Sequence, residues 1–122
     1  MGKLPALDPE HLAQFTGSQE FYRHQIIRDI IYTQGAKYVA DAAHAYWLLD
    51  EIALAQRCIR SVAAEEFQVW DLAIKGNGTA ELTCGDGNGR TVFAKRIEHT
   101  DFPAPGIRLY FCNQCIHLPS EY

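Results

Sequence analysis

The sequence contains no apolar run long enough to serve as a secretory signal or to cross a lipid bilayer. Its first residues, Met1 to Asp8, interleave Gly, Lys, Pro and Asp with only a few apolar side chains. We therefore expect a cytoplasmic protein that makes no contact with a membrane.

A basic excess is missing as well. The chain has 11 Lys and Arg against 15 Asp and Glu, which gives a formal net charge of −4. Domains dedicated to nucleic acids usually carry an excess of basic residues, which displaces counterions from the phosphates. We therefore do not expect a nucleic acid as the partner.

A disulfide framework is not expected in a cytoplasmic protein. The chain has 122 residues, 48% of them hydrophobic, and so it can build a core of its own. We interpret its four cysteines as thiols.

Known catalytic motifs are also missing. The sequence shows no nucleophile elbow, no P-loop, no dinucleotide-binding fingerprint and no paired metal-ligand motif on a helix. Catalysis therefore has no support from motifs, and we expect no cofactor.

Helical patterns occupy the first half of the chain. Asp8-Pro9-Glu10 is typical of a helix start and predicts a short helix that runs to about Phe15. Apolar residues at spacings of four predict an amphipathic helix between Thr16 and Thr33. A further helical stretch is expected from 36 to about 60, with a break near His44.

Strand patterns follow in the second half, separated by short turns. The expected strands are 67–74, 79–84, 91–98, 107–112 and 115–118. We therefore predict a single α+β domain over residues 1–122. In it, N-terminal helices (about 9–60) pack on a C-terminal antiparallel four- or five-stranded meander sheet (about 67–118).

The stretch CGDGNGR, from Cys84 to Arg90, resembles the loops that bind calcium or phosphate. An EF-hand loop counted from Asp86 would need an oxygen ligand at Arg90 and a Glu at Ile97. A phosphate loop would precede a helix, whereas a β-branched strand is expected here. We therefore interpret these glycines as hairpin-turn residues.

The segment Cys112-Asn-Gln-Cys115 is half of a zinc-ribbon signature. A closed zinc site needs two more ligands, for which Cys84, His99 and His117 are candidates, but a second CxxC motif is missing. We predict that Cys112 and Cys115 are two thiols that flank a hairpin turn, with a zinc site as the alternative.

Aromatic, cationic and acidic side chains recur in two segments of the first half. They predict a binding patch made of Tyr22, Arg23, His24, Tyr46, Trp47 and Asp50. The alternative is that aromatic residues at helical spacing belong to the core. Asp41 and His44, one helical turn apart, are interpreted as surface residues, because such pairs are common on solvated helix faces.

An ordered set of short motifs spans nearly the whole chain. The motifs are FTGS from Phe15, FYRH from Phe21, YTQGAKY from Tyr32, AYWLLD from Ala45, FQVW from Phe67, LTCGDGNG from Leu82, TDFP from Thr100 and LPSEY from Leu118. Together they resemble a family of small bacterial domains of unknown function, often met in plasmid- and phage-rich genomes. The resemblance implies no activity, cofactor or catalytic residue.

Two classes of function follow from these observations. The first is a non-catalytic protein-interaction or inhibitor module linked to mobile elements, with a protein partner and with self-association left open. The second is a small enzyme or small-molecule-binding protein that uses His24, Tyr46, Trp47 and Asp50 in a crevice between helices and sheet. A deep pocket that joins these four residues would favour the second class, whereas an exposed apolar or acidic patch would favour the first.

The C-terminal segment from Leu118 to Tyr122 lies within the family resemblance. We predict that it docks on the fold, with Pro119 ending the last strand. Tyr122 is expected to pack against the helical layer or the sheet edge.

Overall fold

A computed structural model describes residues 7–16 and 20–122. Within these residues the chain forms one seven-stranded mixed sheet in the order β1-β2-β7-β6-β3-β4-β5. The strands are β1 (Phe21–Arg23), β2 (Ile31–Thr33), β3 (Gln68–Ile74), β4 (Ala80–Gly85), β5 (Thr91–Ile97), β6 (Gly106–Cys112) and β7 (Cys115–His117).

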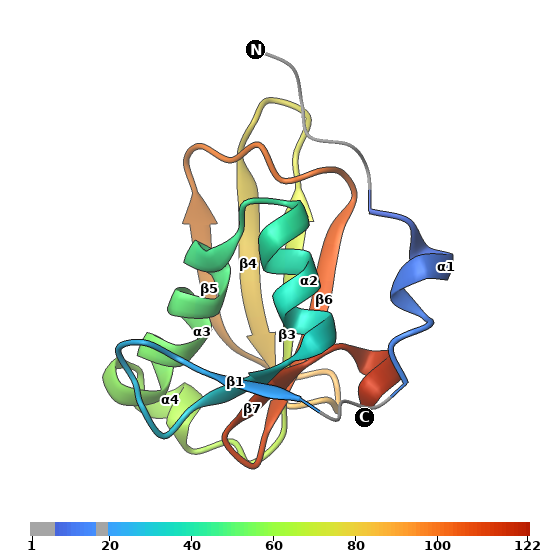
Figure 1. Ribbon diagram of the computed structural model, residues 1–122. Coiled ribbons are helices and arrows are strands. Elements are labelled where there is room, and N and C mark those ends of the chain that lie inside the picture. Colours follow the sequence, from blue (N-terminus) through green and yellow to red (C-terminus); the bar gives the residue numbers. More distant parts are fainter. Residues whose placement is uncertain (1–6, 17–19) are drawn as a thin grey trace.

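Helices lie across one face of this sheet, with α2 and α3 in front of the long strands in Figure 1. The helices are α1 (Pro9–Leu12), α2 (Gln34–Ala42), α3 (Tyr46–Cys58), α4 (Arg60–Ala63) and the 3-10 turn η1 (Pro119–Glu121). The predicted break near His44 is confirmed, because this residue has a φ of 51° between α2 and α3. None of the described helices is both long and apolar enough to span a bilayer.

The predicted antiparallel four- or five-stranded meander is wrong. All five expected strands form, but β6 pairs with β3 on the side away from β4, so the chain returns across the sheet after β5. Beyond β6, the strand β7 pairs in parallel with β2, which makes the sheet mixed and extends it to seven strands. The apolar strand β3 thereby gains a neighbour on each edge, which a meander with β3 as its first strand would not provide.

The predicted amphipathic helix between Thr16 and Thr33 is also wrong. The described part of this segment is a β-hairpin, in which β1 pairs antiparallel with β2. Ile26 and Ile30 are spaced by four, as on one helix face, yet Ile30 is 0% exposed and Ile26 is 64% exposed. Only Ile31 of these isoleucines lies in a strand, whereas Ile26, Ile27 and Ile30 lie in the loop that joins β1 to β2. Their spacing of four therefore reflects a loop with one buried and one exposed side, and not a helix face.

The core lies between the helices and one face of the sheet. On β3, Gln68, Trp70 and Leu72 point to the helices and are buried. The buried Gln68 amide is fully used: its Oε1 accepts from Trp70 Nε1 at 2.9 Å, and its Nε2 donates to the Gln56 side chain at 2.9 Å. This satisfied network allows a polar side chain to occupy the core.

The hairpin interpretation of CGDGNGR is confirmed. β4 and β5 pair on either side of this loop, and Gly87 and Gly89 adopt positive φ angles of 84° and 93°. The Asp86 carboxylate accepts from the backbone N–H of Asn88 at 2.7 Å and from that of Arg90 at 3.2 Å. The Asp86 side-chain oxygen therefore stabilises the turn through these hydrogen bonds and is not a cation ligand in this loop.

The C-terminal segment docks on the fold, but through Glu121 more than through Tyr122. The Glu121 carboxylate accepts from Thr33 Oγ1 at 2.6 Å, from the Leu118 backbone N–H at 2.9 Å and from the Gly35 backbone N–H at 3.2 Å. It thus lies at the N-terminus of α2, where a negative charge is favourable. Tyr122 rests on aromatic rings of the sheet and stays 76% exposed.

Glycine at position 35 leaves room for this contact. A Cβ atom there would lie 2.6 Å from Glu121 Oε1 and 2.6 Å from Leu118 Cδ1. Glycine therefore lets the C-terminal segment approach the backbone of α2 closely.

The substitution Glu121→Gln should lower the free energy of unfolding by about 1–2 kcal/mol, because one acceptor oxygen and the charge at the α2 terminus are lost. Urea denaturation measures the effect. The matched control is Glu81→Gln on the exposed part of β4, which should stay within about 0.5 kcal/mol of the parent chain. Equal stability of both variants would contradict the capping role of Glu121.

Candidate functional site

His24 follows β1 directly and is the buried centre of the β1–β2 loop, with an exposed fraction of 4%. Its Nδ1 accepts hydrogen bonds from the backbone N–H groups of Ile26 at 3.1 Å and Ile27 at 3.0 Å. Its own backbone N–H donates to the Ile30 carbonyl at 2.8 Å. One imidazole therefore holds the loop in shape.

The other ring nitrogen of His24 connects this loop to α3. Nε2 lies 2.8 Å from Asp50 Oδ1. Because Nδ1 accepts from two N–H groups, the ring proton must sit on Nε2, and this N–H donates to the carboxylate. Both ring nitrogens are thus engaged, and neither is placed to take a proton from a substrate.

A crevice of about 270 Å³ opens beside Asp50, between the β1–β2 loop and α3. It is lined by His24, Gln25, Ile26, Tyr32, Tyr46, Leu49 and Asp50. The Asp50 side chain is 49% exposed, and its second oxygen, Oδ2, has no hydrogen-bond partner in the described part of the chain. The crevice therefore presents one carboxylate oxygen to an incoming group.

Tyr46 forms one wall of the crevice and is held by a neighbour on α2. Its hydroxyl donates to Asp41 Oδ1 at 2.5 Å, while Lys37 Nζ lies 2.7 Å from Asp41 Oδ2. Partial burial and this hydrogen bond raise the pKa of Tyr46 to about 12. Tyr46 therefore keeps its proton at neutral pH, and the hydrogen bond to Asp41 holds its ring in place as a wall of the crevice.

The predicted binding patch is only partly assembled. His24, Tyr46 and Asp50 meet in the crevice. Trp47 lines a different hollow, together with His44 and His99 among others.

The remaining predicted residues lie outside the crevice. Tyr22 stacks on Tyr32 with ring centres 5.8 Å apart, and Lys37 Nζ lies 5.3 Å from the Tyr22 ring centre. The guanidinium of Arg23 donates to the Arg28 carbonyl within the loop. Both residues therefore support the loop region and do not line the cavity.

Sequence reasoning named Tyr46 and Asp50 but missed the exposed apolar residues Ile26 and Leu54 beside them. Tyr46, Asp50 and Leu54 recur every four residues on α3 and form a surface line that we name the α3 stripe. Tyr46 is 42% exposed and Leu54 is 40% exposed, and Ile26 of the β1–β2 loop is 64% exposed. The spacing of four on α3 places Tyr46, Asp50 and Leu54 on one helix face and could have been recognised in the sequence. The position of Ile26 could not, because it depends on the β1–β2 hairpin.

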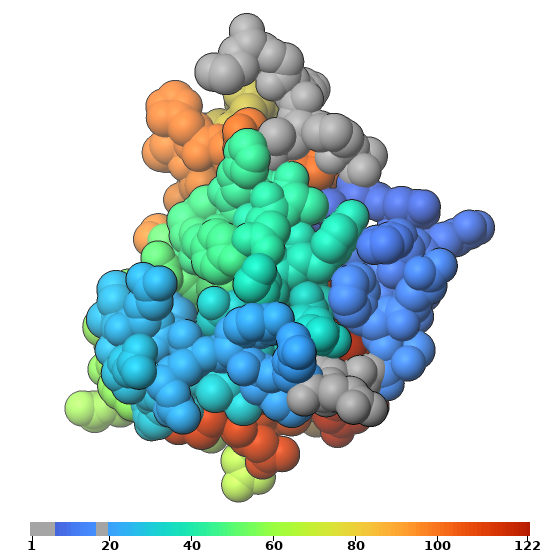
Figure 2. Space-filling view, viewed as in Figure 1, coloured from blue at the N-terminus to red at the C-terminus, as the bar shows by residue number. Residues whose placement is uncertain are grey.

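The same face can be followed in Figure 2, where the β1–β2 hairpin (blue) lies against the helices (green). Of the five exposed large hydrophobic side chains in the described residues, Ile26 and Tyr46 line the crevice and Leu54 follows on the α3 stripe. Exposed apolar area of this kind marks contact surfaces when it gathers in one place.

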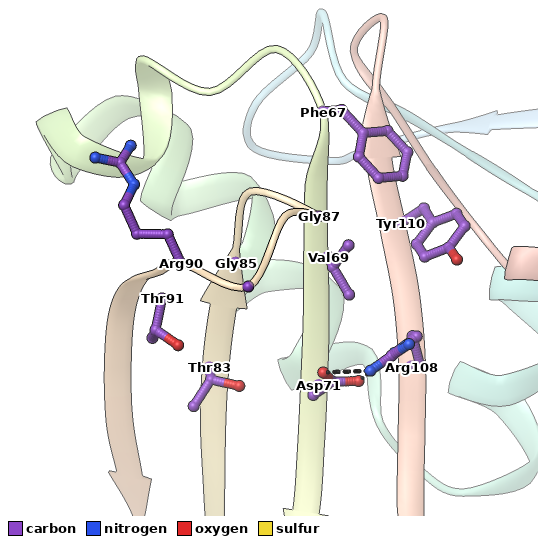
Figure 3. A pocket seen from close by; sticks show the side chains of 11 residues that line it. Phe67, Val69, Asp71, Thr83, Gly85, Gly87, Arg90, Thr91, Arg108 and Tyr110 are labelled. Carbon is purple, nitrogen blue, oxygen red and sulfur yellow. Dashed lines mark hydrogen bonds and ion pairs between the residues drawn. The ribbon is translucent and has the colours of Figure 1, made fainter.

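A second hollow, of about 310 Å³, lies on the sheet face opposite the helices (Figure 3). Its charged groups are already paired: Arg108 donates to both Asp71 oxygens at 2.7 and 3.1 Å, and Arg90 lies 2.8 Å from Glu65. This groove therefore presents less unsatisfied charge to a ligand than the crevice does.

Cys112 and Cys115 face each other across the β6–β7 turn, as the hairpin interpretation requires. The turn residues Asn113 and Gln114 adopt positive φ angles of 52° and 62°. Burial raises the pKa of Cys112, and it raises that of Cys115 to about 11. In residues 7–16 and 20–122 we find no group of three His, Cys, Asp or Glu that could hold a metal, so the zinc alternative gains no further ligands there.

The substitution His24→Ala should lower the free energy of unfolding by about 1–3 kcal/mol, because two loop N–H groups lose their acceptor. Thermal and urea denaturation measure this loss. The exposed His99 offers a matched control, and His99→Ala should change stability by less than about 0.5 kcal/mol. A tolerated His24→Ala substitution would show that the imidazole does not organise the loop.

The four cysteines should differ in their reaction with iodoacetamide near neutral pH. Cys58 is exposed, whereas burial raises the pKa of Cys84 to about 12 and that of Cys115 to about 11. A raised pKa leaves less thiolate, so we expect Cys58 to be alkylated first and Cys84 only after unfolding. Peptide mass spectrometry of a time course gives the order, and faster labelling of Cys112 or Cys115 than of Cys58 would contradict it.

Comparison with known proteins places the chain in a family but does not supply an activity. No curated protein and no solved structure matches it. A model of a family of unknown function, DUF6876, matches residues 7–122. Because this match covers nearly the whole chain, the protein belongs to the DUF6876 family of unknown function.

Proposed function

We propose that the protein is a non-catalytic interaction module that binds a protein partner with the α3 stripe and the facing tip of the β1–β2 loop. One observation carries the proposal: Ile26, Tyr46 and Leu54 expose apolar side chains around the carboxylate of Asp50. An apolar surface around a few polar groups is typical of protein contact sites.

The energetics of this surface support a protein partner. Full burial of a large apolar side chain contributes about 1.5–3 kcal/mol. Ile26, Tyr46 and Leu54 lie on two elements that His24 fixes to each other through Asp50. A rigid contact surface loses little conformational entropy on binding, so more of this burial remains as affinity.

The state of the ionisable groups supports a binding role over a catalytic one. Both ring nitrogens of His24 are engaged, and Tyr46 has a pKa raised to about 12. The thiols of Cys84, Cys112 and Cys115 also have raised pKa values. A nucleophile in an enzyme usually has a lowered pKa or a free base beside it, and these groups have neither.

The proposal includes a cellular setting that rests on the sequence resemblance alone. In this setting the module works in the cytoplasm of a bacterium as an accessory or inhibitor protein of a plasmid or phage. Self-association is an alternative use of the same surface.

Site-specific photo-crosslinking in the native host tests the interaction surface. Ile26 and Leu54 are replaced, one at a time, by a photo-crosslinking amino acid, and Glu81 on the opposite sheet face is the matched exposed control. We expect the same discrete adduct from positions 26 and 54 and none from 81, and we expect Leu54→Asp to abolish the adduct at position 26.

Two results would contradict this proposal. Equal adducts from positions 26, 54 and 81 would show non-specific contact, and no adduct from 26 or 54 would show that the surface is unused. An adduct with twice the 13.8 kDa mass of the chain would identify the partner as a second copy of this chain.

A further inference from the structure

We propose that the crevice beside Asp50 binds one organic cation, an alkylammonium or guanidinium group, supplied by a lysine or arginine side chain of the partner. The inference rests on the interaction role proposed above and specifies the chemistry of the partner's anchor. It is carried by three features of the crevice, namely its uncompensated charge, its aromatic walls and its size.

The charge of Asp50 is not balanced by a cation of the chain. The neighbouring carboxylates on the helices are paired with lysines: Asp41 Oδ2 lies 2.7 Å from Lys37 Nζ, and Glu51 Oε2 lies 2.8 Å from Lys95 Nζ. Asp50 instead accepts the Nε2–H of His24, whose ring is neutral because Nδ1 is an acceptor. Among the described residues, Asp50 therefore keeps both its negative charge and an unused oxygen, Oδ2.

The position of this oxygen is fixed before any ligand arrives. The His24 ring is buried, bonded to two backbone N–H groups, and 2.8 Å from Asp50 Oδ1. The carboxylate therefore cannot rotate freely without breaking this hydrogen bond. A preorganised acceptor binds a charged donor at a smaller entropic cost than a mobile one does.

The walls suit the rest of a cationic side chain. Tyr32 and Tyr46 contribute aromatic rings, which attract cations, and Ile26 and Leu49 contribute apolar area for a methylene stem. The chain itself shows this preference next to the crevice, where Lys37 Nζ lies 5.3 Å from the ring centre of Tyr22.

The crevice is large enough for one cationic side chain and lies at the lower edge of the range for small-molecule pockets. Its volume is about 270 Å³. Pockets for whole small molecules usually reach about 300–1,000 Å³. A lysine or arginine side chain can enter the crevice while the partner's backbone stays outside, against Ile26 and Leu54.

NMR titration of the full chain tests the cation site with n-butylammonium and ethylguanidinium as probes. We expect saturable shifts of the Ile26, Tyr46 and Asp50 amides, with a Kd in the millimolar range, and no such shifts with the neutral n-butanol. Affinity should fall at least about fivefold in Asp50→Asn and should fall with added salt. Asp101→Asn, which removes an exposed carboxylate elsewhere, should bind like the parent chain.

The Asp50→Asn variant keeps an acceptor for His24, and its amide spectrum checks that the fold is intact. Equal binding of n-butanol, or unchanged affinity in Asp50→Asn, would overturn the cation site. If both cations fail to bind while adducts persist at positions 26 and 54, the interaction module stands and this inference fails.

The crosslinking assay identifies the source of the cation. If a partner side chain supplies the cation, Asp50→Asn lowers the yield of the adducts at positions 26 and 54. Excess Nα-acetyl-lysine amide, which keeps its side-chain ammonium group, also lowers these yields because it competes with the partner for the crevice. If a free amine binds the purified chain with micromolar affinity while Asp50→Asn leaves the adducts unchanged, the assignment to a partner side chain is wrong.

Discussion

The imidazole of His24 is the interaction on which the candidate site depends. Its Nδ1 accepts hydrogen bonds from two backbone N–H groups of the β1–β2 loop. Its Nε2–H donates a hydrogen bond to Asp50 on α3, 26 positions later in the chain. The hairpin and the helix thereby become one rigid surface. The same bonds engage both ring nitrogens, whereas a catalytic imidazole needs one ring nitrogen free for the substrate.

A second constraint joins the C-terminal segment to β2 and to the start of α2. β2 pairs in parallel with β7, and Glu121 bonds to Thr33 and Gly35 at the start of α2. The C-terminal segment thus completes the support of the hairpin that carries His24. Without β7, the three-residue strands β1 and β2 would form an isolated two-stranded hairpin, which is marginally stable in water.

Charge pairing distinguishes the crevice from the groove on the opposite sheet face. The groove on the opposite sheet face has its arginines bonded to carboxylates, as the Asp71–Arg108 pair in Figure 3 shows. Asp50 is bonded to a neutral ring and is surrounded by exposed apolar side chains. The combination of one available charge and an apolar rim supports the proposed role in specific binding.

The sequence by itself determined the local features: the five strands of the second half, the break at His44 and the tight turn at Gly87 and Gly89. These depend on alternation and turn residues within a few positions of each other. Only the tertiary structure decided that residues 21–33 form a hairpin and that Tyr32 and Leu49 join Asp50, because the isoleucine spacing also fits a helix. The strand pairing with β7 and the His24 bonds, which link distant parts of the chain, select the hairpin.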